Sequence, residues 1–320
     1  MNDKAEVALV NMPFSYSKYP SIQLGTLSAL LKSQGIPVDC HHLNVLFAHK
    51  IGVPLHELIC EKRALFGEWI FSYLLFRDNP KRAEYPRVFK PVFEQLARES
   101  GHSTGYFEDM AVRTAPQFLT QALTAIDWGQ YRLIGFTSTF DQNVASLTMA
   151  KLIKDLYPSV TIVFGGANYD GEMGLEYFRA FPFIDHVVVG EGEESFPRLV
   201  RKVLGGQSSG YPDGIAYREG HDIRLTPNAS LFSDFAKTGP PDYDDYYRLL
   251  AELGEASQGL DRILLYEGSR GCWWGEKHHC TFCGLNAQSM KFRAKSSEQV
   301  AREMAYLSHR YDTARFRLVD

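Results

Sequence analysis

The stretch VTIVFGGAN (residues 160–168) decides the fold, because a short β-branched apolar run that ends in a glycine turn is typical of a buried parallel strand. Similar runs occur at EVALVNMP (6–13), IPVDCHHLNV (36–45), RLIGFTST (132–139) and DHVVVGEGE (185–193). Helical patterns alternate with most of these runs, and helices on both faces of a sheet are what bury them. The sequence therefore predicts an α/β fold on an open parallel sheet within residues 1–205.

The helices expected between these strands have recognisable ends. Ser21 is a candidate N-cap for the first helix, and Gly35 lies where a glycine ends it. Later helices are expected over residues 141–157 and 194–204. Residues 46–128 interrupt the alternation with apolar periods broken by prolines, which predicts a helical insertion. An insertion of this size can act as a lid or an interface, or serve only as a passive cap.

Residues beyond 205 differ in kind from the sheet. Residues 206–258 are expected to be a linker that contains a hairpin turning near Glu219 and Gly220. From residue 259 a second domain is expected, with a strand at RILLYE (262–267), a cysteine-containing segment, a helix over 297–310 and a final strand at RFRLVD (315–320).

Length and composition limit the class of protein. The 320 residues suggest about two domains, and 45% hydrophobic with 22% charged residues is the mixture of a globular protein rather than a disordered or fibrous one. With 34 basic and 38 acidic residues the net charge is −4, so we expect no nucleic-acid partner. Neither a signal peptide nor a membrane span is evident, and we expect a cytoplasmic protein without a membrane partner.

Three of the five cysteines form the most informative pattern. Cys272, Cys280 and Cys283 have the spacing C-x7-C-x2-C, whereas Cys40 and Cys60 are isolated and are expected in the core. Clustered thiols in a cytoplasmic protein indicate a soft metal or an iron-sulfur cluster. Three ligands leave one iron of a 4Fe-4S cluster open to a substrate. The alternative is a zinc site completed by His278 or His279.

Residues 268–286, GSRGCWWGEKHHCTFCGLN, resemble the cluster loop of radical S-adenosylmethionine (SAM) enzymes. The longer first spacing is similar to that of the cobalamin-dependent members that mature ribosomally made peptides. The resemblance implies that Cys272, Cys280 and Cys283 hold a 4Fe-4S cluster whose open iron binds SAM. It also implies that Phe282 lies near the adenine of SAM.

The resemblance extends to residues 1–205, which are similar to a Rossmann-like cobalamin-binding domain. Ligands of such sheets bind at the carboxyl ends of the strands, where glycines admit a flat macrocycle and hydroxyls or amides can bond its side chains. The candidate cobalamin contacts are Ser15, Tyr16, Thr137, Ser138, Thr139, Phe140, Gly165, Gly166, Ala167, Asn168, Gly190, Glu191, Gly192 and Glu193. A pair of glycines after a strand is most often only a tight turn, and a helix N-terminus explains Glu193 and Glu194 more simply than a catalytic role does. The motif D-x-H-x-x-G is absent, so we expect no protein histidine below the cobalt.

The resemblance implies a cobalamin-dependent radical SAM C-methyltransferase that modifies an unactivated carbon of a ribosomally synthesised peptide, as in bacteriocin maturation. Its expected cofactors are a 4Fe-4S cluster, SAM and cobalamin, and its partners are a precursor peptide and an electron donor such as flavodoxin or ferredoxin. A radical SAM barrel takes roughly 200 residues, so we expect this chain to be an N-terminal half that ends within the barrel. Another radical reaction, such as a rearrangement or oxidation, and a non-catalytic cobalamin-binding fragment or subunit remain open.

Overall fold

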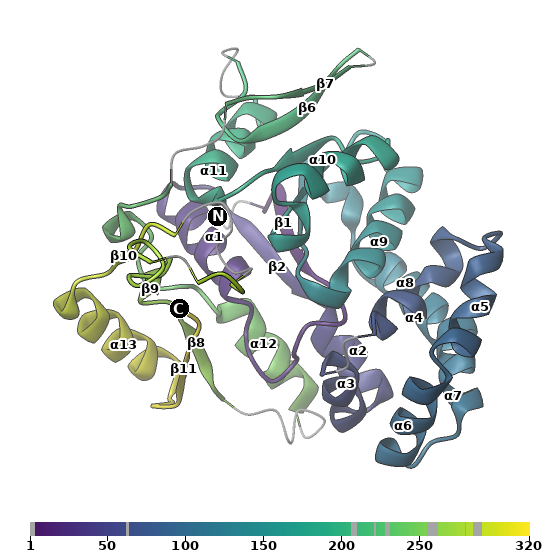
Figure 1. Cartoon of the computed structure of the whole chain (residues 1–320). Helices are drawn as coiled ribbons and strands as arrows, with labels where there is room; N and C mark the ends of the chain where they lie inside the picture. Colours follow the sequence, from purple (N-terminus) through teal and green to yellow (C-terminus); the bar gives the residue numbers. More distant parts are fainter. Residues whose placement is uncertain are drawn as a thin grey trace.

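The structure is a computed structural model that describes residues 4–61, 64–205, 210–220, 222–227, 231–254, 262–278, 280–283 and 290–320. Its centre is a seven-stranded sheet in the order β2-β1-β3-β4-β5-β6-β7 (Figure 1). The strands are β1 (Val7–Asn11), β2 (Val38–His42), β3 (Leu133–Thr137), β4 (Thr161–Gly165), β5 (His186–Val188), β6 (Ile215–Glu219) and β7 (Asp222–Leu225). The first five strands are parallel to one another, which confirms the predicted α/β class. Strand β6 is antiparallel to β5, and β7 is antiparallel to β6.

Helices cover both faces of the parallel part of the sheet, as the continuous apolar runs of its strands predict. One face packs against α1 (Ile22–Ser33) and α11 (Gly192–Val203). The other face packs against α9 (Asn143–Leu156) and α10 (Gly171–Ala180), together with helices of the insertion.

The first helix begins and ends as its sequence predicts. The Ser21 side chain accepts a hydrogen bond from the Leu24 amide, which caps α1. The helix ends beside Gly35, whose φ of 73° is a conformation that only glycine adopts at little cost. Because α1 leaves the carboxyl end of β1, its capped end lies at the edge of the sheet where ligands bind in such folds.

The predicted insertion between β2 and β3 consists of helices. These are α2 (Leu43–Ile51), α3 (Val53–Cys60), α4 (Phe66–Leu75), α5 (Pro80–Val88), α6 (Lys90–Ser100), α7 (Thr104–Asp109), a π-helical turn (Met110–Thr114) and α8 (Ala115–Ala125). Buried aromatic side chains of this layer share a hydrophobic core with the sheet, and the Phe47 ring contacts the rings of both Phe71 and Phe118.

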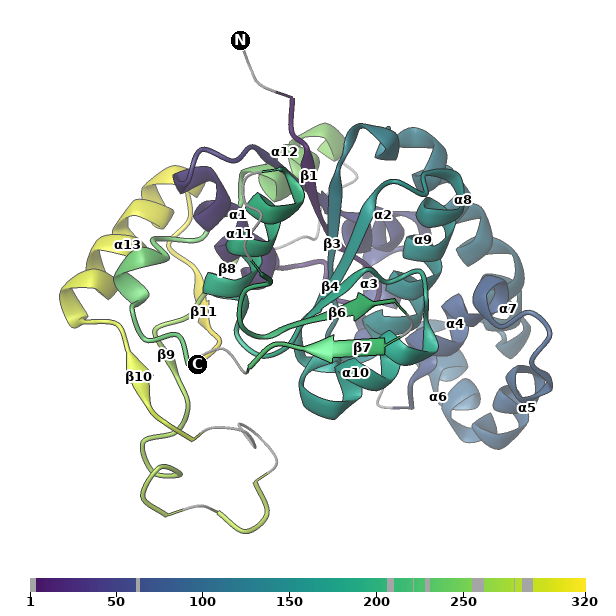
Figure 2. The same cartoon turned by 90° about the horizontal axis from the view of Figure 1, so that it is seen from above.

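The hairpin predicted near residue 220 is formed by β6 and β7, and it extends the sheet beyond β5. The segment that follows contains α12 (Asp244–Leu253), β8 (Leu264–Tyr266), β9 (Ser269–Arg270), β10 (Arg293–Ala294), α13 (Ser297–Tyr311) and β11 (Phe316–Leu318). Strands β8 and β11 pair in parallel, and β9 and β10 form an antiparallel ribbon. This C-terminal segment and the outer helices of the insertion lie on opposite sides of the sheet (Figures 1 and 2). Among the described residues, none of the helices is both long and apolar enough to cross a membrane.

Candidate functional site

A cavity of about 510 Å³ lies at the carboxyl ends of the parallel strands. Its walls come from the loops after β1, β3, β4 and β5, from the start of α1, and from β8, β9 and β11. Strand β1 pairs with β2 on one side and with β3 on the other, so the chain changes direction across the sheet at this point. Such a switch point is where open α/β sheets place their ligands.

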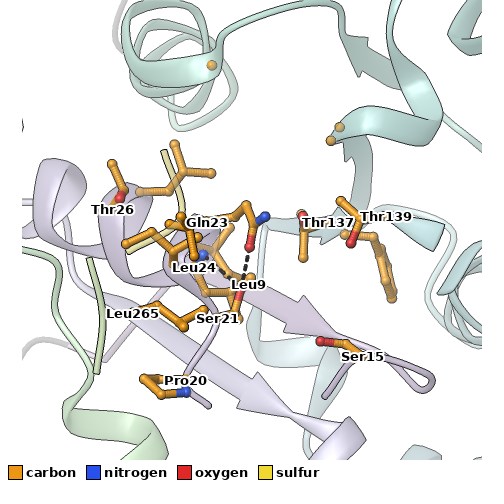
Figure 3. A pocket seen from close by; sticks show the side chains of 18 of the residues that line it. Leu9, Ser15, Pro20, Ser21, Gln23, Leu24, Thr26, Thr137, Thr139 and Leu265 are labelled. Atoms are coloured by element: carbon orange, nitrogen blue, oxygen red, sulfur yellow. Dashed lines mark hydrogen bonds between the residues drawn. The ribbon is translucent and has the colours of Figure 1, made fainter. Parts of the chain in front are cut away.

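Most of the residues predicted to contact cobalamin lie on the wall of this cavity. Those on its wall are Ser15, Tyr16, Thr137, Thr139, Phe140, Gly165, Gly166, Gly190, Glu191, Gly192 and Glu193. Figure 3 shows Ser15, Thr137 and Thr139 on one side of the cavity and Thr26 on the other. Ser138, Ala167 and Asn168 are not on the wall. Instead, the Asn168 side-chain amide donates to the Ser138 hydroxyl at 2.9 Å, which ties two of the loops together.

Two glycines keep backbone close to the cavity. Gly166 has φ of 95°, and a Cβ there would lie only 2.7 Å from the Ser138 carbonyl oxygen. Gly190 has φ of 82°, but a Cβ there would meet no other atom within 4 Å. Gly166 is therefore required by contact and conformation together, whereas Gly190 leaves open space on the wall.

A buried glutamine links the loops on either side of the switch point. The Gln142 side-chain amide donates to the Asn11 side-chain oxygen and to the Met12 carbonyl, both at 2.7 Å. Its carbonyl oxygen accepts from the Thr139 hydroxyl at 2.9 Å. These bonds use both ends of the amide, so the ends of β1 and β3 are held at a defined separation before any ligand binds.

A second polar cluster lies where the insertion meets the cavity. Glu57 accepts bonds from the Ser17 amide and hydroxyl at 2.9 and 2.7 Å, and its oxygen lies 3.3 Å from His56 Nδ1. Burial lowers the pKa of His56 below its ordinary value, although the neighbouring Glu57 opposes this shift. Burial alone would raise the pKa of Glu57, but the bonds from His56 and Ser17 bring it below its ordinary value.

Cys60 stands at the end of this cluster, with its sulfur 3.7 Å from His56 Nδ1. The sequence predicted a core residue, but Cys60 is partly exposed and lines the cavity. Burial raises the pKa of this thiol, so it is uncharged at neutral pH. The sequence carried no indication of this position, because Cys60 lies in the helical insertion and most other wall residues lie in or beside the sheet.

The loop after β5 has partners that the sequence did not indicate. Glu191 binds Arg293 through two bonds of 2.7 and 2.8 Å, and Glu193 binds Arg270. Arg270 also bonds Glu267 at 2.7 and 2.8 Å. The second oxygen of Glu193 is buried and has no hydrogen-bond partner among the described residues. Both glutamates were expected as cobalamin contacts, and they lie on the cavity wall while their side chains bind arginines.

The cysteine loop runs from β9 to β10, outside the cavity wall. The Cys272 sulfur accepts a bond from the Gly275 amide at 3.2 Å, and the Cys283 amide donates to the Cys280 carbonyl at 3.1 Å. Phe282 is 90% exposed and is not on the wall. Within the described part of the chain, no three His, Cys, Asp or Glu side chains are arranged to hold a metal ion. The predicted thiols therefore share one loop but do not converge, and His279 lies outside the described residues.

Curated relatives share part of this chain, whereas no protein-family model matches it. An uncharacterized methyltransferase of Pyrococcus horikoshii is 29% identical over 189 residues, which are 59% of this chain and 39% of that protein. The cobalamin-dependent radical SAM methyltransferase TokK of Streptomyces tokunonensis is 28% identical over 162 residues, 48% of this chain and 22% of that protein. The anaerobic magnesium-protoporphyrin IX monomethyl ester cyclase of Synechocystis is 25% identical over 195 residues, 60% of this chain and 36% of that protein.

Solved structures with the same fold cover nearly the whole chain. The cobalamin-dependent SAM radical enzyme OxsB, with aqua-cobalamin and SAM bound, aligns with a TM-score of 0.59 at 17% identity. The alignment covers 99% of this chain and 34% of OxsB. The radical SAM methyltransferase TsrM from Kitasatospora setae, with cobalamin and a 4Fe-4S cluster bound, aligns with a TM-score of 0.54 at 14% identity. That alignment covers 99% of this chain and 48% of TsrM.

This chain is similar in sequence to a cobalamin-dependent radical SAM methyltransferase, and it shares the fold of two radical SAM enzymes solved with cobalamin bound. It spans less than half the length of each relative and structure named above.

The cavity is suited to cobalamin, whereas the described part of the cysteine loop is not arranged to hold a 4Fe-4S cluster. For cobalamin, the wall offers a glycine backbone at Gly166 and Gly190 and the hydroxyls of Ser15, Thr137 and Thr139. No histidine is among the described residues that line it. For a 4Fe-4S cluster, the three thiols are the right donors, but their arrangement in this structure is not a binding site.

Proposed function

We propose that the protein carrying this sequence is a cobalamin-dependent radical SAM C-methyltransferase that modifies an unactivated carbon of a ribosomally synthesised peptide. One observation carries the proposal. The cavity at the switch point of the sheet is closed on its far side by Leu265, Glu267 and Arg270, which lead directly into the segment containing Cys272. A cofactor in the cavity would therefore lie beside the cysteine loop.

In this proposal cobalamin supplies a methyl group, and SAM with a 4Fe-4S cluster supplies the radical that activates the substrate carbon. The residues of this chain bind cobalamin and orient it. Ser15, Thr137 and Thr139 offer hydroxyls to the amide side chains of the corrin, while Gly166 and Gly190 allow its ring to approach the backbone. Leu9 and Leu24 add apolar wall and exclude water from one side.

The remaining assignments extend from this one. Strand β8, helix α13 and strand β11 form one β-α-β unit with parallel strands, which supports their role as the first part of a radical SAM barrel. We propose that Phe282 contacts the adenine of SAM once the barrel is assembled. A precursor peptide as substrate, flavodoxin or ferredoxin as electron donor, and a cytoplasmic location complete the proposal.

A second function has a specific observation in its favour. The Synechocystis relative is named as a cyclase and not as a methyltransferase, which supports considering another reaction. The same cavity and cysteine loop would then serve another radical reaction, because the fold and cofactors do not fix the product.

One assay separates these functions. The protein that carries this sequence is reconstituted anaerobically and incubated with SAM, a reductant and candidate precursor peptides, and the products are analysed by mass spectrometry. Formation of 5′-deoxyadenosine with a peptide 14 Da heavier, the mass of an added CH2 unit, supports the methyltransferase. Formation of 5′-deoxyadenosine with an altered but unmethylated product supports the second function. Retention of cobalamin without any cleavage of SAM, even with an intact cluster, would make the protein a non-catalytic cobalamin carrier.

A further inference from the structure

The base of the cysteine loop is a two-stranded ribbon in which two arginines stand opposite each other. Arg270 of β9 pairs in register with Arg293 of β10, and the loop between them contains Cys272, Cys280 and Cys283. Two buried cations placed side by side repel each other unless carboxylates compensate them. The ribbon therefore needs acidic partners to hold this register.

The partners come from the loop that follows β5 and from the first turn of α11, both of which line the cavity. Glu191 forms a two-bond fork with Arg293 and lies 3.6 Å from Arg270, while Glu193 binds Arg270. The side chains of Arg293 and Glu193 are only 7% exposed, and those of Arg270 and Glu191 are 19% and 22% exposed. Charge pairs this well buried are costly to break, because the group that remains is left uncompensated.

Neutral contacts reinforce the same junction. The Phe232 amide donates to Glu191 at 2.6 Å, and the Phe232 carbonyl accepts from Arg293. Burial alone would raise the pKa of Glu191, but Arg293, the Phe232 amide and the charge of Arg270 bring it below its ordinary value. Both oxygens of Glu191 are thus committed to the protein, and this carboxylate has little left to offer a cofactor.

We propose that Glu191 and Glu193 are positioning residues that hold the base of the cysteine loop at the rim of the cavity, through Arg293 and Arg270. The loop after β5 and the first turn of α11 thereby connect the cofactor cavity of the sheet to the segment that would carry the cluster. The importance of this connection for catalysis rests on the proposed function, whereas the connection itself is a property of the chain without cofactors.

The test uses the full chain without cofactors. Hydrogen exchange is followed by mass spectrometry in peptides that contain residues 268–278, and the rate at which iodoacetamide alkylates Cys272 is measured in parallel. In Glu191→Gln and Glu193→Gln we expect the alkylation of Cys272 to be about ten-fold faster than in the unmodified chain, since a charge-assisted bond is lost. Hydrogen exchange in the loop peptides should rise by the same factor, while exchange in β3 stays unchanged. Glu194→Gln is the matched control, because Glu194 lies on the same helical turn, is exposed and makes none of these arginine contacts. Its rates should match those of the unmodified chain.

Hydroxocobalamin titration of the same variants distinguishes positioning from cofactor binding. We expect its dissociation constant to change by less than about two-fold in Glu191→Gln, the size of a surface effect. The proposal would be overturned if hydrogen exchange of the loop in Glu191→Gln and Glu193→Gln equals that in Glu194→Gln. If these two variants then also bind hydroxocobalamin more weakly, Glu191 and Glu193 are cofactor contacts instead. If either variant unfolds, Arg293→Lys and Arg270→Lys keep the charge but remove the fork, and the same rise in loop exchange is expected. A chain that binds no cobalamin would contradict the proposed function and leave the exchange result unaffected.

Discussion

The Gln142 side-chain amide donates a 2.7 Å hydrogen bond to the side-chain oxygen of Asn11, and both residues are almost fully buried. Asn11 ends β1 and Gln142 follows β3, so this bond joins the two strands between which the chain reverses its direction of travel across the sheet. Leu9 of β1 and Thr139, whose hydroxyl donates to Gln142, both line the cavity. The shape of the cavity thus depends on a contact between residues 131 positions apart.

Replacing Gln142 with alanine should weaken this junction. The change leaves the Asn11 oxygen and the Thr139 hydroxyl without their partner, and we expect a loss of about 1–3 kcal/mol in the free energy of unfolding. Urea denaturation measures it, and hydroxocobalamin affinity should fall in parallel. Gln117→Ala, at an exposed position of α8, is the control. Equal stability of the two variants would show that the Gln142 bonds do not hold the strand ends.

Gly166 offers a test of backbone packing at the cavity. Gly166→Ala combines an unfavourable φ of 95° with a Cβ contact of 2.7 Å to the Ser138 carbonyl. Gly35→Ala has a similar φ of 73° but meets no other atom within 4 Å, so it measures the conformational cost alone. We expect Gly35→Ala to cost about 1 kcal/mol in unfolding free energy and Gly166→Ala about 1–3 kcal/mol more. Equal losses would mean that the Ser138 loop yields without cost.

Glu68 should make the stability of the insertion depend on pH. It accepts bonds from the Asn143 and Val144 amides at the start of α9, and burial raises its pKa from 4.5 to about 7. A carboxyl with a raised folded-state pKa stabilises the fold fully below pH 4.5, and this stabilisation is lost as the pH rises through 7. Its partial exposure reduces the effect to about 1–2 kcal/mol.

Thermal unfolding between pH 4.5 and pH 8 tests this sign. The unmodified chain should lose stability over this range relative to Glu68→Gln, whose side chain does not ionise. Glu108→Gln, at an exposed position of α7, should leave the pH profile unchanged. A profile for Glu68→Gln that parallels the unmodified chain would refute the assigned role of Glu68.

Cys60 reports on occupation of the cavity. Its thiol lines the wall and its pKa is raised by burial, so alkylation by iodoacetamide should be slow at pH 7 and accelerate in alkaline solution. Saturating hydroxocobalamin should slow it at least about five-fold if the corrin covers this wall. Cys272, outside the wall, provides the internal comparison by peptide mass spectrometry. Equal protection of both thiols would indicate a general effect on the chain, and no protection of Cys60 would place cobalamin elsewhere.

The parallel sheet and most of the cavity could be predicted because they depend on local patterns. Apolar runs such as residues 160–164 identify the strands, and parallel strands bring the loops that follow them to one edge. Ser138 and Asn168 were expected to contact a ligand for the same reason, but the two side chains bond each other. Residue type and position in a loop do not say which neighbour satisfies a polar group.

The ties between distant segments could not be predicted. Glu193 meets Arg270 across 77 positions and Glu191 meets Arg293 across 102, and nothing local in either segment identifies its partner. The sequence suggested cofactor contacts and a helix N-terminus for these acidic residues, since both readings need only local information. The ion pairs become visible only when the ribbon of β9 and β10 is placed beside the sheet.

Anaerobic reconstitution with iron, sulfide and hydroxocobalamin, followed by absorption spectra and analysis of iron, cobalt and zinc, tests the central claim most directly. We predict about four irons and one cobalt per chain, and loss of iron but not of cobalt in Cys280→Ala. Cys40→Ala, a change at a buried core thiol of β2, should keep both metals. Zinc bound without iron or cobalt would contradict the account, because the cavity and the cysteine loop would then hold neither of the cofactors assigned to them.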